Sequence, residues 1–239
     1  MQLELIGKKI EASDVFSFSF KSKETFPWKP GQYLRYNIPH AHPDERGESR
    51  YFTIASAPFE GEVKLVCRIP PPPQRDPAQA GETEDSTFKL ALKNLPVGSV
   101  IEATGPKGAF VVEDPALSYV FIAGGIGITP FRAILLDFSH KGSEMNITLL
   151  YANRTNDIVF KSEFDDLTVK HPFFKVHYIV DPERINEGSI HHYVSDLSVP
   201  YFYVSGPEPM VIAMEEVLEK MGVQKEKIRH DYFPGYISI

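Results

Sequence analysis

The chain has 239 residues, of which 42% are hydrophobic and 24% are charged, and its net charge is −7. This composition is that of a globular protein with a buried core, and it excludes wholesale disorder. The negative charge argues against a general nucleic-acid binder, since binding to phosphates requires basic residues. A single cysteine, Cys67, excludes a disulfide framework, a four-cysteine zinc site and an all-cysteine iron–sulfur cluster within this sequence.

The first half, as far as residue 113, predicts a small antiparallel barrel. Its short segments alternate apolar and polar residues, as half-buried strands do, and turns containing glycine or proline separate them. A single helix, 86–95, interrupts the strands. The six expected strands cover residues 15–20, 33–38, 51–55, 63–69, 99–103 and 109–112.

Residues 70–85 fit neither half of the chain. Their proline run, acidic residues and small residues cannot bury much surface, so they predict an exposed loop. The loop is either an ordinary insertion or a flap over a bound cofactor or partner.

Strands and helices alternate in the second half, from residue 116 to residue 239. Apolar runs suited to buried parallel strands occur at 119–123, 147–152, 175–180 and 201–205. Helices are expected at 130–139, 163–171, 190–197 and 207–221. This alternation predicts an open parallel sheet, and the chain therefore divides into two domains, 1–113 and 116–239.

The sharpest local signal is a glycine-rich turn between a buried strand and a helix. Gly124, Gly125 and Gly127 follow the strand, and Pro130 stands in the first turn of the helix. Glycines let the backbone approach a ligand, and the N–H groups of a helix start favour an anion such as a pyrophosphate. The alternative is a tight strand–helix turn that needs glycine only for packing.

A second signal lies in the barrel half, at residues 50–56. Arg50 can hold a phosphate through bidentate hydrogen bonds, and its aromatic neighbours Tyr51 and Phe52 can stack on a flat heterocycle. The same residues also fit a strand with an exposed arginine, so both interpretations stay open.

Five ordered motifs give the chain a resemblance to the ferredoxin–NADP reductase family over essentially its whole length. The matching segments are PGQY (30–33), RYFT (50–53), GPKGAF (105–110), GGIGITP (124–130) and GPEPM (206–210). Motifs in a fixed order are more specific than any one of them. The resemblance implies a six-stranded antiparallel flavin-binding barrel followed by a parallel-sheet, Rossmann-like nucleotide-binding domain.

The resemblance also implies roles for residues of the barrel. Arg50 would contact the flavin phosphate, and Thr53 would supply the hydroxyl near flavin N5. Phe52, with Tyr51 beside it, takes the position of the tyrosine that stacks on the flavin ring. Arg68 lies on a strand that supplies flavin contacts, and Ser86 resembles the serine that meets the pyrophosphate. Ser86 also suits an N-cap position at an anion-binding helix start.

In the second half, the resemblance places the nucleotide pyrophosphate along the glycine turn and the nicotinamide beside the GPEPM segment. The residues implied are Gly125, Gly127, Thr129, Gly206, Pro207 and Met210. Ser205 stands where the family often has a cysteine, which puts a thiol contribution at the nicotinamide in doubt. Arg154 follows a strand, where it would either favour the 2′-phosphate of NADP or form a local ion pair.

Aromatic residues near the C-terminus are expected to cover the flavin face where nicotinamide enters. Residues 231–233 resemble a terminal acid-x-Phe element of the family, and either Phe233 or Tyr236 would provide the cover. The alternative is a final edge strand that packs its aromatic side chains. Thr53, Ser205 and Phe233 are therefore the expected catalytic positions. The eight histidines show no metal-binding spacing, so no metal is expected.

The resemblance implies an oxidoreductase that moves a hydride from NAD(P)H to FAD, with NADP as the first expectation and NAD as the second. Electrons would pass to a separate acceptor such as a ferredoxin, a flavodoxin-like protein or an oxygenase component. The alternatives are a reductase of ferric chelates, quinones or free flavin, a non-catalytic electron-relay subunit, and a nucleotide-binding module without flavin. No secretory signal or membrane span is evident, so a cytoplasmic protein without a membrane span and without a nucleic-acid partner is expected.

Overall fold

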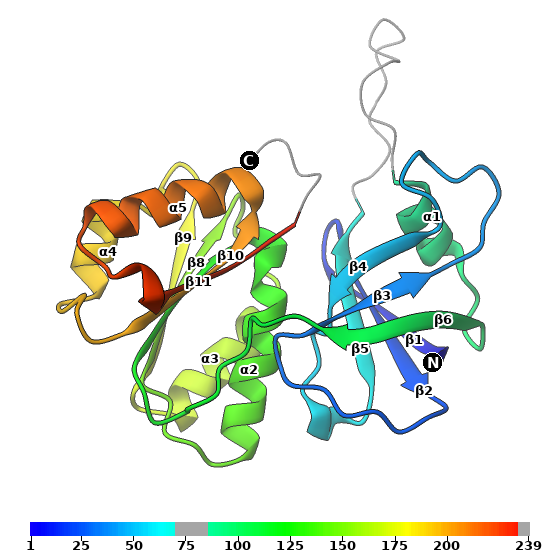
Figure 1. Ribbon diagram of the computed structural model, residues 1–239, viewed down its shortest axis with the longest axis horizontal. Coiled ribbons are helices and arrows are strands. Elements are labelled where there is room, and N and C mark those ends of the chain that lie inside the picture. Colours follow the sequence, from blue (N-terminus) through cyan, green and yellow to red (C-terminus); the bar gives the residue numbers. More distant parts are fainter. Residues whose placement is uncertain (70–85, 234–239) are drawn as a thin grey trace, which may run out of the picture.

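The structure, a computed structural model, describes residues 1–69 and 86–233 (Figure 1). A six-stranded antiparallel sheet forms the first part of the fold, and a five-stranded parallel sheet flanked by helices forms the second. The predicted fold class is therefore confirmed. The exposed-loop prediction for residues 70–85 and the role predicted for Tyr236 lie outside the described residues.

The first sheet curls into a half-barrel. Its strands are β1 (Gln2–Ala12), β2 (Val15–Ser22), β3 (Tyr33–Asn37), β4 (Ser49–Thr53), β5 (Val63–Arg68) and β6 (Val100–Lys107). Their order is β4-β3-β6-β1-β2-β5, and all pairs are antiparallel. Helix α1 (Thr87–Asn94) closes the core with Phe88 and Leu92, and the short helix η1 (Pro58–Glu60) follows β4.

One predicted strand is wrong, and one observed strand was not predicted. Residues 109–112 form no strand. Phe110 instead packs edge-on against Phe131 and Tyr203 of the second part, so this apolar pattern serves the boundary between the two sheets. The missing sixth strand is β1, whose register shifts after Leu5 and Ile10 break the regular alternation that predicts a strand.

The second sheet contains the four predicted strands and a fifth at its edge. Its strands are β7 (Tyr119–Gly124), β8 (Ile147–Asn153), β9 (Phe174–Val180), β10 (Tyr201–Pro207) and β11 (Ile228–Phe233), in the order β11-β10-β7-β8-β9. All four pairings are parallel. An edge strand is therefore present at the C-terminal end as β11, and its Tyr232 is 43% exposed.

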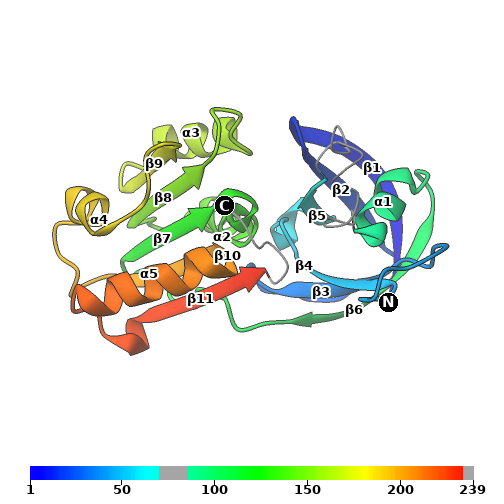
Figure 2. The same cartoon turned by 90° about the horizontal axis from the view of Figure 1, so that it is seen from above.

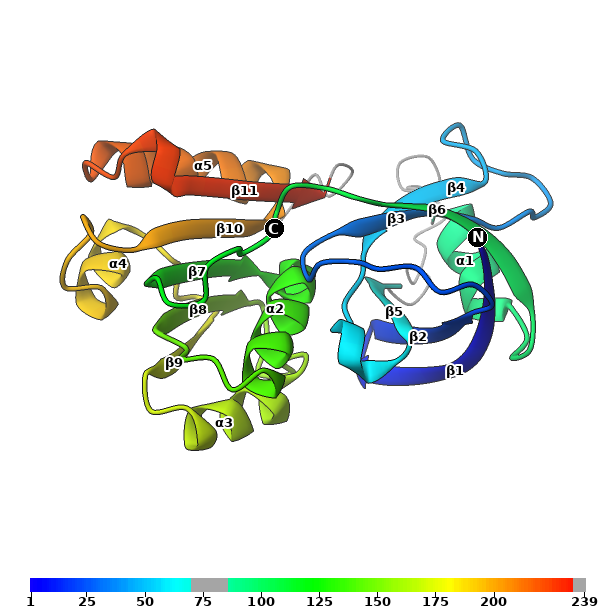
Figure 3. The same cartoon turned by 60° about the horizontal axis from the view of Figure 1, so that its bottom comes forward.

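Helices cover both faces of the parallel sheet (Figures 2 and 3). Helices α2 (Ile128–His140) and α3 (Lys161–Lys170) pack on the face that carries Phe121 and Leu149. Helices α4 (Glu187–Tyr193) and α5 (Glu208–Lys220) pack on the opposite face, which carries Ile122 and Leu150. Successive strand residues point to opposite faces, so continuous apolar strands fill both layers. Two further short helices are η3 (Gly125–Gly127) and η4 (Lys225–Lys227).

Helix α2 lies on the side of the second sheet that faces the barrel (Figure 1). The core cluster that contains its Phe131 and Ile134 continues into the barrel through Val15, Ala55 and Val66. The two sheets therefore share buried apolar surface, which fixes their relative placement. Within residues 1–69 and 86–233, no helix has the length and apolar character needed to span a bilayer.

Candidate functional site

The side chain of Arg50 is fixed where β4 meets α1. Its Nη1 donates to the backbone carbonyls of Arg46, Gly47 and Ser49 at 3.0, 2.7 and 2.8 Å. Its Nη2 donates to the carboxylate of Asp44, and its guanidinium lies 5.6 Å from the centre of the Phe88 ring. These contacts hold the positive charge in one place beside the first turn of α1.

Asp44 joins Arg50 to the start of α1. Its Oδ2 accepts from the Thr87 backbone N–H at 3.3 Å, and the Asp44 N–H donates to the Thr87 hydroxyl at 3.0 Å. Burial alone would raise the pKa of this carboxyl, but hydrogen bonds from Arg46 and Arg50 hold that pKa well below its ordinary value. Asp44 is therefore an anion at neutral pH, and its hydrogen bonds connect Arg50 of β4 to Thr87 of α1.

Two buried polar atoms in this region have no hydrogen-bond partner among the described residues. They are Arg50 Nε and Ser86 Oγ, and Ser86 holds the N-cap position of α1 without making a side-chain cap bond. Buried donors are ordinarily satisfied, so this pair indicates a missing acceptor. A phosphate at a helix start, held by an arginine and a serine, satisfies both. The residues present therefore fit the pyrophosphate of FAD.

The other predicted residues of the flavin motif lie on two faces of β4. Phe52 stacks on Phe88 with ring centres 5.8 Å apart, on the same side as Arg50. Tyr51 faces the other way, is 61% exposed, and meets Tyr33 edge-on. Thr53 is buried at the end of the strand. The structure thus brings Phe52 to Arg50 and leaves Tyr51 apart from them.

Close packing or backbone conformation requires glycine at positions 124, 125 and 127, where β7 ends and the loop follows. A Cβ on Gly127 would lie 2.2 Å from the Ser205 carbonyl oxygen, and one on Gly124 would lie 2.2 Å from Met210 Sδ. Gly125 has a φ of +51°, and the nearest atom to a Cβ there would be Arg68 Nη2 at 4.0 Å. Packing thus accounts for Gly124 and Gly127, and Gly125 presents its backbone to a cavity. Thr129 is buried and donates to the Ile126 carbonyl at 3.2 Å.

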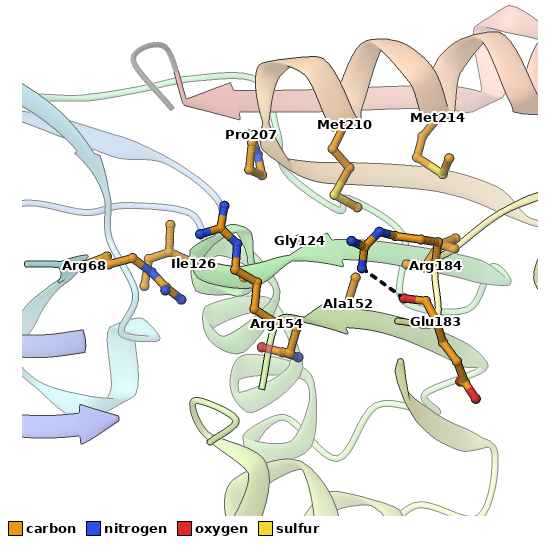
Figure 4. Close-up of a pocket in the computed structure, with 13 residues that line it drawn as sticks. Arg68, Gly124, Ile126, Ala152, Arg154, Glu183, Arg184, Pro207, Met210 and Met214 are labelled. Atoms are coloured by element: carbon orange, nitrogen blue, oxygen red, sulfur yellow. Dashed lines mark hydrogen bonds between the residues drawn. The ribbon is translucent and has the colours of Figure 1, made fainter. Parts of the chain in front are cut away.

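That cavity, of about 250 Å³, lies at the carboxyl ends of the parallel strands (Figure 4). This edge is where open α/β sheets bind ligands. Predicted residues that line it are Arg68, Gly125, Arg154, Pro207 and Met210. Arg68 reaches it from β5 of the barrel while paired to Asp14 at 2.9 Å. Gly206 is buried and does not line the cavity itself. A Cβ added to Gly206 would lie 3.3 Å from the backbone of Gly124.

Sequence reasoning missed several residues of the cavity. Glu183 and Arg184 line it from the turn after β9, and Met214 lines it from the second turn of α5 (Figure 4). Arg184 is paired with Asp181. The available signal was positional, because the residues after β9 must meet those after β8 at the same edge of a parallel sheet.

Ser205 and Asp231 are neighbours on adjacent parallel strands, paired in register across β10 and β11. Ser205 Oγ is buried and has no partner among the described residues. Burial raises the pKa of Asp231 to about 6, while the nearby His230 lowers it. Phe233 is in register with Pro207 through its backbone. These strands therefore gather Ser205, Asp231 and the Pro207 turn on the sheet beside the cavity.

Comparison with protein families matches both halves of the chain. Residues 2–112 match the model of an oxidoreductase FAD-binding domain, and residues 121–216 match that of an oxidoreductase NAD-binding domain. The first match contains the Arg50 region and Arg68, and the second contains the glycine loop and the other residues that line the cavity.

Among proteins of known name, the chain is similar to one component of the Na(+)-translocating NADH-quinone reductase. The component from Marinomonas sp. (strain MWYL1) is 31% identical over 204 residues, which are 78% of this chain and 49% of that protein. Its counterpart in Pseudomonas aeruginosa is 30% identical over 203 residues. The chain spans about half the length of these relatives.

Solved structures share the whole two-part fold. The cytochrome b5 reductase domain of Ulva prolifera nitrate reductase is 27% identical with a TM-score of 0.80, and the match covers 96% of both chains. Ferredoxin-NADP+ reductase from Plasmodium falciparum is 17% identical with a TM-score of 0.78, and the match covers 97% of this chain and 95% of that one, which shows a common fold. The chain therefore belongs to the ferredoxin–NADP reductase family of NAD(P)H-dependent flavin oxidoreductases, with FAD and NAD(P) as its cofactors.

Proposed function

We propose that this chain takes a hydride from NAD(P)H onto FAD held by residues 1–113 and passes the electrons to a separate acceptor protein. The observation that carries the proposal is the cavity shared by both halves. Gly125 presents the nucleotide loop to it, and Arg68 reaches it from the barrel. A nucleotide seated there would thus be touched by the domain that holds the flavin.

The residues of the chain have binding and orienting roles in this proposal. FAD supplies the hydride-accepting chemistry when it is bound, and the protein supplies placement and electrostatics. Arg50 and Ser86 would hold the flavin pyrophosphate, and Phe52 would flank the ring. Gly125 would hold the pyrophosphate of the nucleotide. Arg68, which the sequence suggested as a flavin contact, would also contact that pyrophosphate, because it lines the nucleotide cavity. Thr53 and Ser205 would line the reaction site. None of these roles requires a strong acid or base.

The test is spectroscopic. The purified chain reconstituted with FAD should be yellow, with an absorption band at about 450 nm. NADPH or NADH added without oxygen should bleach that band. A chain that retains no flavin after reconstitution would overturn the proposal. Retained flavin that neither coenzyme bleaches would leave a flavin-binding protein without the reductase activity.

The acceptor is proposed to be a protein, with a ferredoxin, a flavodoxin-like protein or an oxygenase component as the first candidates. A second candidate function is an electron-relay subunit of a larger complex, because the matched relatives are named as one component of a quinone reductase. Pull-down against candidate carriers, followed by turnover with each, separates the two. Rapid bleaching without turnover on small acceptors or on any single carrier favours the relay.

A further inference from the structure

Arg132 is a buried charge in helix α2, which also buries Asp137, and the main partners of Arg132 come from the barrel. Its side chain is 5% exposed. Nη1 donates to the Ala55 carbonyl at 2.8 Å and to Glu60 Oε2 at 3.0 Å, while Nη2 donates to Glu60 Oε1 at 3.0 Å. This is a bidentate arginine–carboxylate pair, whose two parallel bonds fix orientation as well as distance.

The same guanidinium also has a carboxylate partner within the nucleotide half of the chain. Nη2 lies 2.8 Å from Glu163 Oε2 on α3, and the guanidinium lies 4.9 Å from the centre of the Phe160 ring. Arg132 therefore has one carboxylate partner across the boundary, Glu60, and one partner inside the nucleotide half, Glu163.

The barrel side of the pair is itself rigidly held. Glu60 Oε2 also accepts from the Ala57 backbone N–H at 2.6 Å, which ties the carboxylate to the start of η1. At the far end of α2, His140 stacks on Phe59 of η1 with ring centres 4.0 Å apart. Helix α2 thus contacts η1 at two places, through the Arg132–Glu60 pair and through the stacked rings of His140 and Phe59.

The position of this contact joins the two halves of the proposed site. Ala55 follows Thr53, where the flavin-motif strand ends, by two residues. Helix α2 begins at Ile128, directly after the glycine loop that opens on the nucleotide cavity. Arg132, bonded to Ala55 and Glu60, therefore links the residues that follow β4 to the helix that begins after that loop.

We propose that Arg132 and Glu60 are positioning residues for hydride transfer, which set the placement of the nucleotide loop against the flavin strand. The inference rests on the proposed function, since it assigns these residues to the same site. A buried bidentate pair resists sliding and rotation of α2 on η1, and hydride transfer depends steeply on the separation of the reacting atoms.

The chain offers a matched pair of neutral substitutions. Glu60→Gln removes the negative charge of the partner in the barrel half and keeps an amide oxygen that can accept from the Ala57 N–H. Glu163→Gln removes the negative charge of the partner in the nucleotide half. Both leave Arg132 with one charged partner, although Glu60 makes two bonds to Arg132 and also lies 3.7 Å from Lys64, whereas Glu163 makes one contact. The deciding readout is therefore the placement of the two halves, and not the loss of stability.

The first measurement is structural and needs no flavin. Spin labels at Lys21→Cys and Lys170→Cys, both exposed and on opposite sides of the boundary, report the distance between the halves. The native Cys67 is buried, and burial raises its pKa to about 12, so it stays unlabelled. We expect Glu60→Gln to shift or broaden the distance distribution and Glu163→Gln to leave it unchanged.

The second measurement is the anaerobic rate of flavin bleaching at saturating NADPH. We expect Glu60→Gln to slow it about tenfold or more at unchanged FAD content, and Glu163→Gln to change it less than about twofold. Equal behaviour of the two variants in both measurements would overturn the positioning role. If the unsubstituted protein is not bleached at all, the proposed function fails, and the distance measurement still decides whether Glu60 holds the two halves together.

Discussion

Single side chains set how tightly the barrel should hold FAD. We expect Arg50→Ala to weaken FAD binding about tenfold to a hundredfold, the effect of losing a charge-assisted hydrogen bond to a phosphate. Arg46→Ala is the matched control, because Arg46 contacts the same Asp44 carboxylate but is 48% exposed. Titration of flavin-free protein with FAD, followed by flavin fluorescence, measures both affinities. Equal affinity of Arg50→Ala and the unsubstituted chain would refute the phosphate role.

Arg154 should determine which coenzyme the cavity prefers. Its position at the carboxyl end of β8 suits a 2′-phosphate, which NADPH has and NADH lacks. We expect Arg154→Ala to raise the Michaelis constant for NADPH about tenfold and that for NADH little. Arg184→Ala provides the comparison, since Arg184 lines the same cavity from the turn after β9. Equal changes for both coenzymes in Arg154→Ala would remove the reason to prefer NADP.

Asp231 should make stability depend on pH in a narrow window. Burial raises its pKa from 3.8 to about 6, so the folded chain holds this proton more tightly than the unfolded chain does. The stability contributed by the protonated form is therefore complete below pH 3.8 and is lost as the pH rises to about 6. We expect Asp231→Asn to be more stable than the unsubstituted chain at pH 7, by up to about 3 kcal/mol, and similar to it near pH 4. Urea unfolding at both pH values measures this. An equal difference at the two pH values would show that Asp231 is not the titrating group.

At the scale of elements, the glycine loop keeps β7, β10 and α2 in close contact. Gly127→Ala would place a methyl group 2.2 Å from the Ser205 carbonyl oxygen, so the backbone of β10 or η3 must move. We expect a loss of about 3 kcal/mol in the free energy of unfolding and a higher Michaelis constant for the coenzyme. The control is Gly7→Ala, because a Cβ there meets nothing within 4 Å. Thermal unfolding compares the two, and equal midpoints would contradict the packing argument.

The regular elements were predictable from the sequence, and the irregular ones were not. The buried strand β7 is an unbroken apolar run and β10 begins with one, so period and length identify them. In β1, two register shifts interrupt the alternation that marks a strand. In residues 109–112, apolar residues face a boundary between two sheets, and a local pattern does not distinguish that surface from a strand face.

The same division applies to the site. Arg50 and the glycine loop were predictable, because each lies in a local motif with its own chemistry. Asp44 and Glu60 were not, because each acts on a residue distant in the sequence, Thr87 or Arg132. Arg132 left one unused signal, since a single arginine within an apolar helix indicates a buried charge that requires a partner. Tertiary contacts name that partner, and a sequence pattern does not.

For the whole molecule, the two halves should stay together without their covalent link. Residues 114–118 connect them, yet the core around Phe131 and the Arg132–Glu60 pair both cross the boundary. We therefore expect a chain cut at a protease site placed between Asp114 and Ser118 to elute as one species on gel filtration. Addition of Glu60→Gln should make the cut halves separate more readily. Separation of the halves in the unsubstituted cut protein would show that the link, and not the packing, keeps them together.

Each sheet contains a pairing of long range along the chain. In the parallel sheet β7 pairs with β10, residue 119 with residue 201, and in the barrel β6 pairs with β1, residue 102 with residue 2. Pairing across so long a loop loses more chain entropy before it gains any contact, so it forms slowly. In refolding, the local pairs β1–β2, β3–β4 and β7–β8 should form first. The ability to retain flavin should lag behind them, because the barrel cannot hold a ligand until its first and last strands have met.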